Sequence, residues 1–217
     1  MDSQISGTAP PLLRGYLHLV GAIVAPFALL HILFIADSPR GVVGGAIFGA
    51  SLIILYSTSA IYHLLPLDHR LRGMMKRLDH SIIFVFIAGA YTPFALQLMD
   101  NAWGIPVLLV VCGLAGVGLI TTLAGPTLPR WIGVGLYLLL GWVGIVAISE
   151  LVTALPGEAF AMLVLSGILF SVGGTMYAIR WPDLFPRVFG YHEMFHTLQV
   201  SATAVLYLVV TVYVLPS

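Results

Sequence analysis

The chain has 217 residues, of which 59% are hydrophobic and only 8% are charged, and its formal net charge is zero. A soluble domain carries about 25% charged residues, so this composition excludes a soluble globular protein and favours one embedded in lipid. The zero net charge argues against nucleic acid or any other strongly charged partner. The one cysteine, Cys112, has no second cysteine with which to pair and says nothing about redox compartment.

Seven apolar runs follow one another along the chain, and each is long enough to cross the hydrocarbon core of a bilayer. They predict an all-α, polytopic integral membrane protein, because lipid offers backbone groups no partners outside a helix. The connections are short, so we expect a single domain over residues 1–217, without a cleavable signal peptide. The predicted spans are 15–36, 41–66, 79–99, 104–124, 130–149, 158–180 and 189–214.

Basic residues predict how these spans are oriented, because Lys and Arg gather in cytoplasmic loops. If the spans alternate in direction, eight basic residues fall on the side of the amino terminus, and only Arg40 falls on the other. The amino terminus is therefore predicted to be cytoplasmic and the carboxyl terminus external. The eight residues are Arg14, Arg70, Arg72, Lys76, Arg77, Arg130, Arg180 and Arg187.

Three glycines recur every four positions in the second span, at Gly41, Gly45 and Gly49. Small residues at this spacing let two helices approach closely in a membrane. We interpret them as packing positions.

Ionisable side chains within spans are costly and indicate function by default. His63 ends the second span, Asp79 begins the third, and His192 and His196 begin the seventh. The predicted topology places all of them at the cytoplasmic ends of their helices, at similar depth. Ser59 lies one turn before His63, and His192 and His196 are four residues apart, so each pair shares a helix face.

Three imidazoles and a water make a tetrahedral catalytic zinc site with one open position. His63, His192 and His196 are therefore candidate ligands. Asp79 is a candidate for a carboxylate that hydrogen-bonds to the metal-bound water or to a ligand histidine. The plainer interpretation of a lone histidine at a helix end is an interfacial side chain or a cap, but three at matching depth favour the metal.

The segment from His192 to His196 also matches the H-E-x-x-H pattern of zinc metalloproteases. In soluble proteases of this kind the third ligand typically comes from downstream of the pair. Here only 21 residues follow His196, and they contain no His, Asp, Glu or Cys. The motif therefore indicates metal binding strongly and peptidase chemistry weakly.

At these positions the chain resembles the hemolysin III family, the bacterial branch of the progestin and adipoQ receptor (PAQR, adiponectin-receptor-like) superfamily. The stretches that carry the resemblance are "SAIYHLL" (59–65), "RLDHSIIFVFIAGAYTPF" (77–94) and "GYHEMFHTLQVSA" (190–202). The resemblance implies a seven-helix protein of the bacterial cell (inner) membrane, with zinc near the cytoplasmic face. By motif position it makes His63, His192 and His196 ligands, places Asp79 at the metal through water, and gives Ser59 a hydrogen bond beside it.

The resemblance bears on two further residues, and at one of them the chain departs from the family pattern. In the receptor branch the residue after the first histidine of the pair need not be acidic, so Glu193 is expected to be dispensable for metal and to point toward a neighbour or the interface. Relatives often carry an acid shortly before a histidine of the first span, whereas this chain reads "PPLLRGYLHLVG". We expect His18 to be interfacial, with contact to a polar substrate group as the alternative.

The remaining histidines receive no part in the predicted site. His31 lies in the external half of the first span and is expected to be packed or water-facing. His69 and His80 border a cytoplasmic loop and are given no role.

The favoured function is a zinc-dependent intramembrane hydrolase of a lipid amide, such as a ceramide-like molecule, near the cytoplasmic leaflet. Superfamily relatives are linked to this chemistry; Asp79 would act as general base, and Ser59 would orient water or the scissile carbonyl. Whether the protein is an enzyme stays open. The alternative is a non-enzymatic lipid sensor with structural zinc, in which Asp79 would bind the ion directly as the fourth ligand. A pore-forming hemolysin is less favoured because the spans are nearly free of charge, and an intramembrane protease also ranks low.

Overall fold

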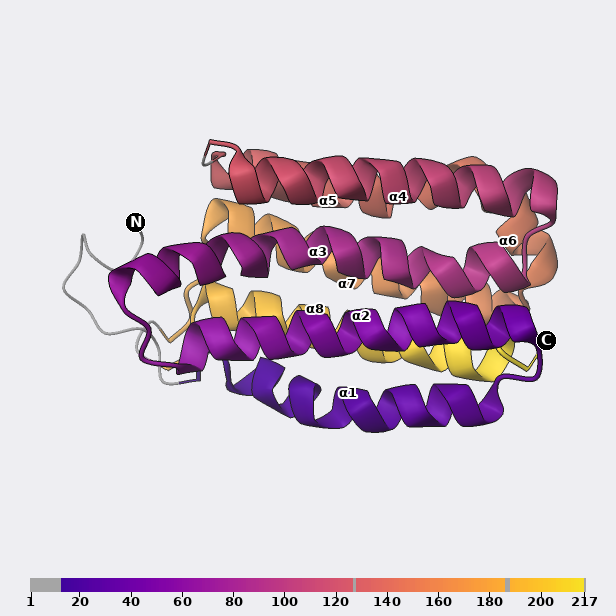
Figure 1. Ribbon diagram of the computed structural model, residues 1–217, viewed down its shortest axis with the longest axis horizontal. Coiled ribbons are helices and arrows are strands. Elements are labelled where there is room, and N and C mark those ends of the chain that lie inside the picture. The colour runs from indigo at the N-terminus through magenta and orange to yellow at the C-terminus, as the bar shows by residue number, and fades with distance from the viewer. Residues whose placement is uncertain (1–12, 127, 186–187, 217) are drawn as a thin grey trace.

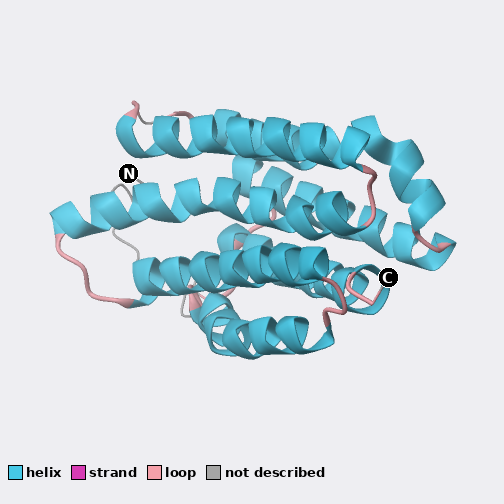
Figure 2. Ribbon diagram, turned by 45° about the vertical axis from the view of Figure 1, so that its right-hand side comes forward, coloured by secondary structure: helices cyan, strands magenta, loops and turns pink. Residues whose placement is uncertain are grey.

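The computed structural model describes residues 13–126, 128–185 and 188–216, a bundle of long helices joined by short turns (Figures 1 and 2). Within these ranges, seven helical segments are long and apolar enough to cross a membrane. The predicted all-α, seven-span architecture is therefore confirmed. The elements are α1 (Tyr16–Ile35), α2 (Pro39–Leu64), α3 (His69–Gln97), α4 (Asn101–Ala124), α5 (Arg130–Gly141), the 3₁₀ turn η1 (Val143–Ala147), α6 (Ile148–Ala154), α7 (Gly157–Ile179), α8 (Tyr191–Val209) and the π turn η2 (Val210–Val214).

Helices that follow one another in the chain pack side by side, from α1 through α4 and again from α7 to α8. Figure 1 shows α4 and α5 along one edge of the bundle and α1 along the opposite edge, with α2, α3, α7 and α8 between them. Helix α8 also contacts α1, so the last span closes the bundle against the first. This closure brings residues from the two ends of the sequence together.

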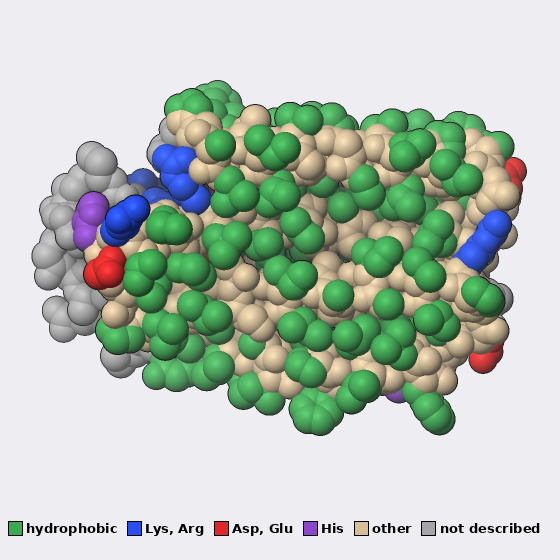
Figure 3. All heavy atoms as spheres, viewed as in Figure 1, with side chains coloured by type: hydrophobic (Ala, Val, Ile, Leu, Met, Phe, Trp, Pro, Cys, Tyr) green, Lys and Arg blue, Asp and Glu red, His purple; other side chains and the backbone are tan. Residues whose placement is uncertain are grey.

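The flank of the bundle is covered by large apolar side chains, and charged side chains lie at its two ends (Figure 3). Phe34 is 89% exposed, Leu109 and Leu139 are each 69% exposed, and Phe27 is 68% exposed. A water-soluble protein rarely exposes so large an apolar surface, whereas lipid matches it. The chain is an integral membrane protein.

Polar side chains fix the start of three helices by accepting hydrogen bonds from otherwise unpaired backbone N–H groups. Ser38 accepts from Gly41 at the start of α2, and Asp100 accepts from Ala102 and Trp103 at the start of α4. Asp68 does the same for α3 by accepting from Leu71 across 2.8 Å. Each short turn thereby becomes a definite helix boundary.

The cap at Asp68 corrects the predicted start of the third span. The segment 69–78 was expected to be a loop, but α3 already begins at His69. Its leucines, arginines, methionines and lysine are good helix formers. The arginines and the lysine place this first part of α3 beyond the apolar part of the helix. Asp79 consequently lies about three turns into α3 rather than at its first residue.

The fifth span is also not the continuous helix that the sequence predicts. Helix α5 ends at Gly141, η1 follows, and α6 completes the crossing. Glycine is a poor helix residue, and the break is stabilised from α3. The Tyr91 hydroxyl donates to the Gly141 carbonyl and accepts from the Gly144 N–H, each across 2.7 Å. These bonds satisfy backbone groups that lipid could not.

The predicted close packing of the second span is confirmed at two of its three glycines. A side chain at Gly45 would collide with Ile32 of α1, and one at Gly49 would come within 2.7 Å of Leu29. Gly41 lies instead beside Ser38 and Gln97. Helices α1 and α2 therefore approach closely along their middle turns.

Most basic residues lie at one end of the bundle, as the alternation of the spans requires. Helices α1, α3 and α5 start at this end and α7 finishes there, whereas Arg40 belongs to the start of α2 at the opposite end. Arg187 lies outside the described residues. That the basic end is cytoplasmic remains a prediction.

Candidate metal centre

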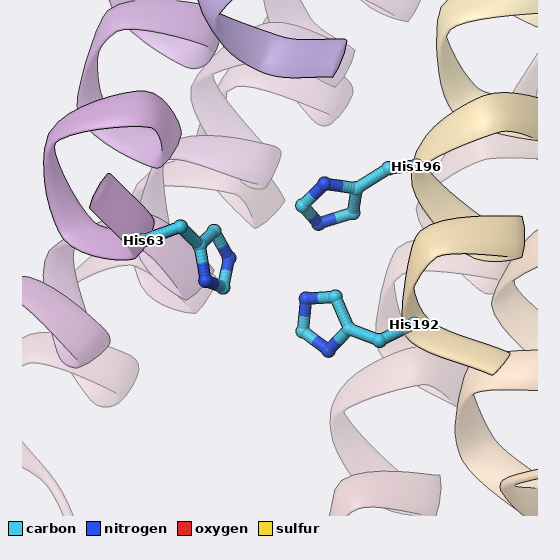
Figure 4. Close-up of side chains that lie close together, drawn as sticks. All are labelled: His63, His192 and His196. Carbon is cyan, nitrogen blue, oxygen red and sulfur yellow. The ribbon is translucent and has the colours of Figure 1, made fainter. Parts of the chain in front are cut away.

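Three histidines from two helices converge at the basic end of the bundle. His63 lies in the last turn of α2, and His192 and His196 lie in the first two turns of α8. Figure 4 shows the His63 ring pointing from α2 toward the two rings of α8. Each residue offers a ligand atom, and these atoms all lie within 4.8 Å of one another. The three predicted ligands are thus close enough to bind one metal ion.

The three rings are inclined to one another, which suits coordination because ring nitrogens bind through lone pairs in the ring plane. The ring planes of His63 and His192 meet at 84°, those of His63 and His196 at 64°, and those of His192 and His196 at 57°. The Nε2 atoms of His63 and His192 are buried and have no hydrogen-bond partner among the described residues. Buried polar atoms are nearly always paired, so these two nitrogens are available to bind a metal ion.

Gly15 fixes the position of His63. It precedes α1 with a φ of +89°, and an added side chain there would come within 2.7 Å of the His63 Cβ and 3.0 Å of Leu64. Only glycine adopts this backbone conformation readily while leaving room for such an approach. The start of α1 therefore packs directly against the end of α2.

Glu193 points away from the histidines and holds two chain segments together. It is 1% exposed; its Oε1 accepts from Arg14 Nε across 2.8 Å, and its Oε2 accepts from the Gly190 N–H across 2.9 Å. The carboxylate thus caps α8 and pairs with Arg14, two residues before α1. The expectation that Glu193 points toward a neighbour is confirmed, and that neighbour is Arg14.

His18 is not the interfacial residue that the sequence analysis favours. It is 2% exposed, and its ring is stacked on that of His196, with centroids 3.8 Å apart and planes within 5°. It also meets the Tyr56 ring edge-on. The prediction was wrong because a histidine near a membrane boundary can face inward or outward, and the flanking apolar residues suit both.

Asp79 and Ser59 lie beside the three histidines without belonging to the group that can share one ion. Asp79 lines a cavity together with His192 and His196, while the close ligand atoms among the described residues come from the histidines. Ser59 is 2% exposed and is a hydrogen-bond partner of the Asp79 carboxyl group. Both residues line a small space together with His196.

The cavity has a volume of about 260 Å³ and extends along the bundle from the histidines. Asp79 and Phe94, both in its wall, are separated by about 22 Å of helix α3. Its lining is mostly apolar and comes from α3, α5, η1, α6, α7 and α8; examples are Ile83, Phe86, Leu163, Phe170 and Leu206. The cavity is thus a mostly apolar space with a carboxylate and imidazoles at one end.

Two histidines without a predicted role have definite places. His80 lines the cavity; its Nδ1 lies 2.6 Å from the Lys76 carbonyl oxygen, and its Nε2 lies 3.2 Å from the Tyr177 hydroxyl. His31 is exposed on α1, with its Nδ1 2.6 Å from the Tyr207 hydroxyl. His80 thus lies beside the site, and His31 is far along α1 from it.

The segment from Arg14 to His18 also belongs to the site, although its sequence does not predict this. Arg14 contacts Glu193, Gly15 contacts His63, and His18 contacts His196. A charge, a glycine and a histidine within five residues at the start of a span are a signal of a tightly packed boundary. That signal does not show which residues the segment contacts, nor that two of them are His63 and His196.

Comparison with known proteins connects this arrangement to one family. The haemolysin-III-related family matches residues 8–207. The chain is 33% identical to the hemolysin-3 of Bacillus cereus over 207 residues, covering 92% of this chain and 90% of that protein. It is 29% identical to the hemolysin-3 homolog of Bacillus subtilis (strain 168) over 199 residues, covering 90% of each.

Proposed function

The chain belongs to the haemolysin-III-related family and is an integral protein of the bacterial cell membrane, and on this premise we propose that it is a zinc-dependent hydrolase of a lipid amide. The substrate class is a ceramide-like molecule, cleaved near the cytoplasmic leaflet. The observation that carries the proposal is the convergence of His63, His192 and His196 at the end of an apolar cavity.

The donor set fits zinc. Neutral imidazoles are preferred zinc ligands, and catalytic sites use three protein ligands, whereas structural sites use four. Three histidines gather within the described part of the chain, and two of them carry buried nitrogens that lack partners there. This count supports a catalytic ion over the structural ion of a lipid sensor. When bound, zinc would act as a Lewis acid and lower the pKa of a coordinated water to about 7.

Asp79 is the candidate general base. Its carboxylate would take the proton of the attacking water as the water oxygen bonds to the amide carbonyl carbon. The protonated Asp79 carboxyl group would then give that proton to the departing nitrogen as the C–N bond breaks, leaving a carboxylic acid and an amine. Ser59, buried beside Asp79, would hold the carboxylate in the orientation that this transfer requires.

The cavity supports a lipid substrate. Its apolar walls would bury a hydrocarbon chain, and its carboxylate and imidazole groups lie at the end formed by Asp79, His80, His192 and His196. A lipid amide bound with its hydrocarbon chain along the apolar walls would therefore have its polar part beside the histidines. The related proteins carry the name hemolysin, but a pore needs a polar path, and an apolar lining argues against one.

Metal analysis of the purified protein, paired with a ceramide hydrolysis assay, tests the proposal. We expect about one zinc per chain in the wild type, its loss in His196→Ala, and its retention in the control His31→Ala, since His31 is distant and exposed. Zinc retention in His196→Ala would refute the ligand assignment. Zinc binding without any turnover by the wild type would favour the sensor.

A further inference from the structure

His18 has two buried ring nitrogens that no described residue satisfies. The side chain is 2% exposed, and neither Nδ1 nor Nε2 has a hydrogen-bond partner there. A neutral imidazole carries one donor and one acceptor, and leaving such groups unpaired in a protein interior costs about 1–3 kcal/mol each. Something other than a described side chain must therefore pair with this ring.

His18 is not placed to share the ion held by the other three histidines. Its ring lies parallel to that of His196, with the centroids 3.8 Å apart. Because the two ring planes are nearly parallel, an ion in the plane of the His196 ring would lie out of the plane of the His18 ring, where no lone pair of His18 points. His18 therefore touches a candidate ligand without being one.

A small chamber adjoins both His18 and His196. Its volume is about 20 Å³, and about 10–15 Å³ suffices to hold one water molecule. The chamber is lined by one histidine of α1, two residues of α2, two of α3 and three of α8, namely His18, Leu55, Ser59, Asp79, Ile83, Phe195, His196 and Gln199. Its polar groups include donors and acceptors, as a buried water requires.

The chamber shares a wall with the apolar cavity. Asp79, His196 and Gln199 line both spaces. A molecule in the chamber would therefore contact the same residues that face a substrate in the cavity. Buried waters typically make about three hydrogen bonds to groups that would otherwise be unpaired. One water here can bond to His18 and to two of Ser59, Asp79 and Gln199.

We propose that His18 is a positioning residue, which binds one ordered water in this chamber and, with it, fixes the orientation of His196 and Asp79. Stacking restrains the plane of the His196 ring, and the water connects His18 to the carboxyl side of the site. The positioning role of His18 rests on the proposed function, whereas the presence of the water does not. It assigns His18 a role through its nitrogens, which distinguishes it from a packing residue.

A crystal structure of the wild-type protein that shows ordered water tests the first part without any variant. We expect one density peak in the chamber, within hydrogen-bond distance of a His18 nitrogen. A dry chamber, or one filled by a neighbouring side chain, would overturn the inference. This result does not depend on metal loading, so it also decides the matter if the proposed function fails.

Titration with Co²⁺, followed by visible absorption, tests the positioning role independently of turnover. His18→Phe keeps a flat ring that can stack on His196 but removes both nitrogens. We expect it to weaken Co²⁺ binding about 10-fold or more and to change the absorption spectrum, because supporting partners of ligands contribute about 10- to 100-fold to metal affinity.

The matched control is His31→Phe, the same substitution at an exposed position of the same helix, which should leave affinity and spectrum unchanged. His18→Asn or His18→Gln, which place an amide near Nδ1 or Nε2, should restore much of the affinity. A His18→Phe protein that unfolds at the wild-type temperature and binds Co²⁺ with wild-type affinity and spectrum would show that His18 only packs. Absence of Co²⁺ binding by the wild type would overturn the positioning role together with the proposed function. The crystal structure would still show whether the chamber holds a water.

Discussion

Arg14 donates a hydrogen bond from Nε to Oε1 of Glu193 across 2.8 Å, and this ion pair joins two segments 179 residues apart. Glu193 is the acidic residue of the H-E-x-x-H motif, the position that supplies the base in zinc proteases. Here the carboxylate is occupied with Arg14 and with the Gly190 N–H. The motif therefore supplies two candidate ligands and one structural contact between the last span and the segment just before the first.

Glu193→Gln separates these roles. The amide keeps a bond to the Gly190 N–H but loses the charge that pairs with Arg14, so we expect the free energy of unfolding to fall by about 1–3 kcal/mol. Zinc content at saturating zinc should stay at the wild-type level, and ceramide turnover should fall less than 10-fold. Thermal unfolding and metal analysis measure the two effects. A stable, zinc-loaded but inactive Glu193→Gln protein would restore the protease-like role of this residue.

Gly15→Ala should disturb His63 from the side of α1. A side chain at a φ of +89° costs about 1–2 kcal/mol, and the added carbon would meet the His63 Cβ. We expect a lower unfolding temperature and zinc affinity reduced about 10-fold. Gly113→Ala in α4 is the matched control, because an added carbon there meets no described atom within 4 Å. Equal zinc affinity in both variants would show that Gly15 does not position His63.

Asp79→Asn tests the proposed general base. The substitution keeps the size of the side chain but removes the proton acceptor, so turnover of a ceramide-like substrate should fall about 100-fold or more. Zinc content should be unchanged, since Asp79 lies outside the three-histidine group. Loss of zinc from Asp79→Asn would instead make Asp79 a direct ligand and favour a structural site.

Tyr91→Phe tests the stabilisation of the broken fifth span. Removing the hydroxyl leaves the Gly141 carbonyl and the Gly144 N–H without the partner they have across 2.7 Å. We expect a loss of about 1–3 kcal/mol in the free energy of unfolding, because these groups face an apolar environment. Tyr213→Phe removes a hydroxyl bond to Glu158 at the end of the bundle and should cost less. Similar unfolding curves for both variants would contradict this account.

The seven spans and the convergence of His63, His192 and His196 could be predicted from the sequence. Apolar length is a strong signal in lipid, and alternation of the spans places all three histidines at one end. The break at Gly141 could not, because it depends on a hydroxyl group from α3. The early start of α3 depends on the cap at Asp68. It was missed because the residues that follow are charged and therefore do not look like part of a membrane span.

The role of the first span was the hardest to predict. In a soluble helix, a polar face shows which side is buried, but α1 is apolar on all sides and exposes residues such as Phe27 and Phe34 to lipid. Nothing in that pattern shows that His18 faces the core. Its position follows from α8 packing against α1, which is a property of the whole bundle.

The central claim is that zinc held by three histidines cleaves a lipid amide. Its most direct test is the rate at which the purified protein releases fatty acid from a ceramide, measured before zinc removal by a chelator, after removal, and after zinc is restored. We predict turnover that disappears with the metal, returns with added zinc, and stays absent in His196→Ala at any zinc concentration. Turnover that survives both treatments, or no turnover by the zinc-loaded wild type, would contradict the account.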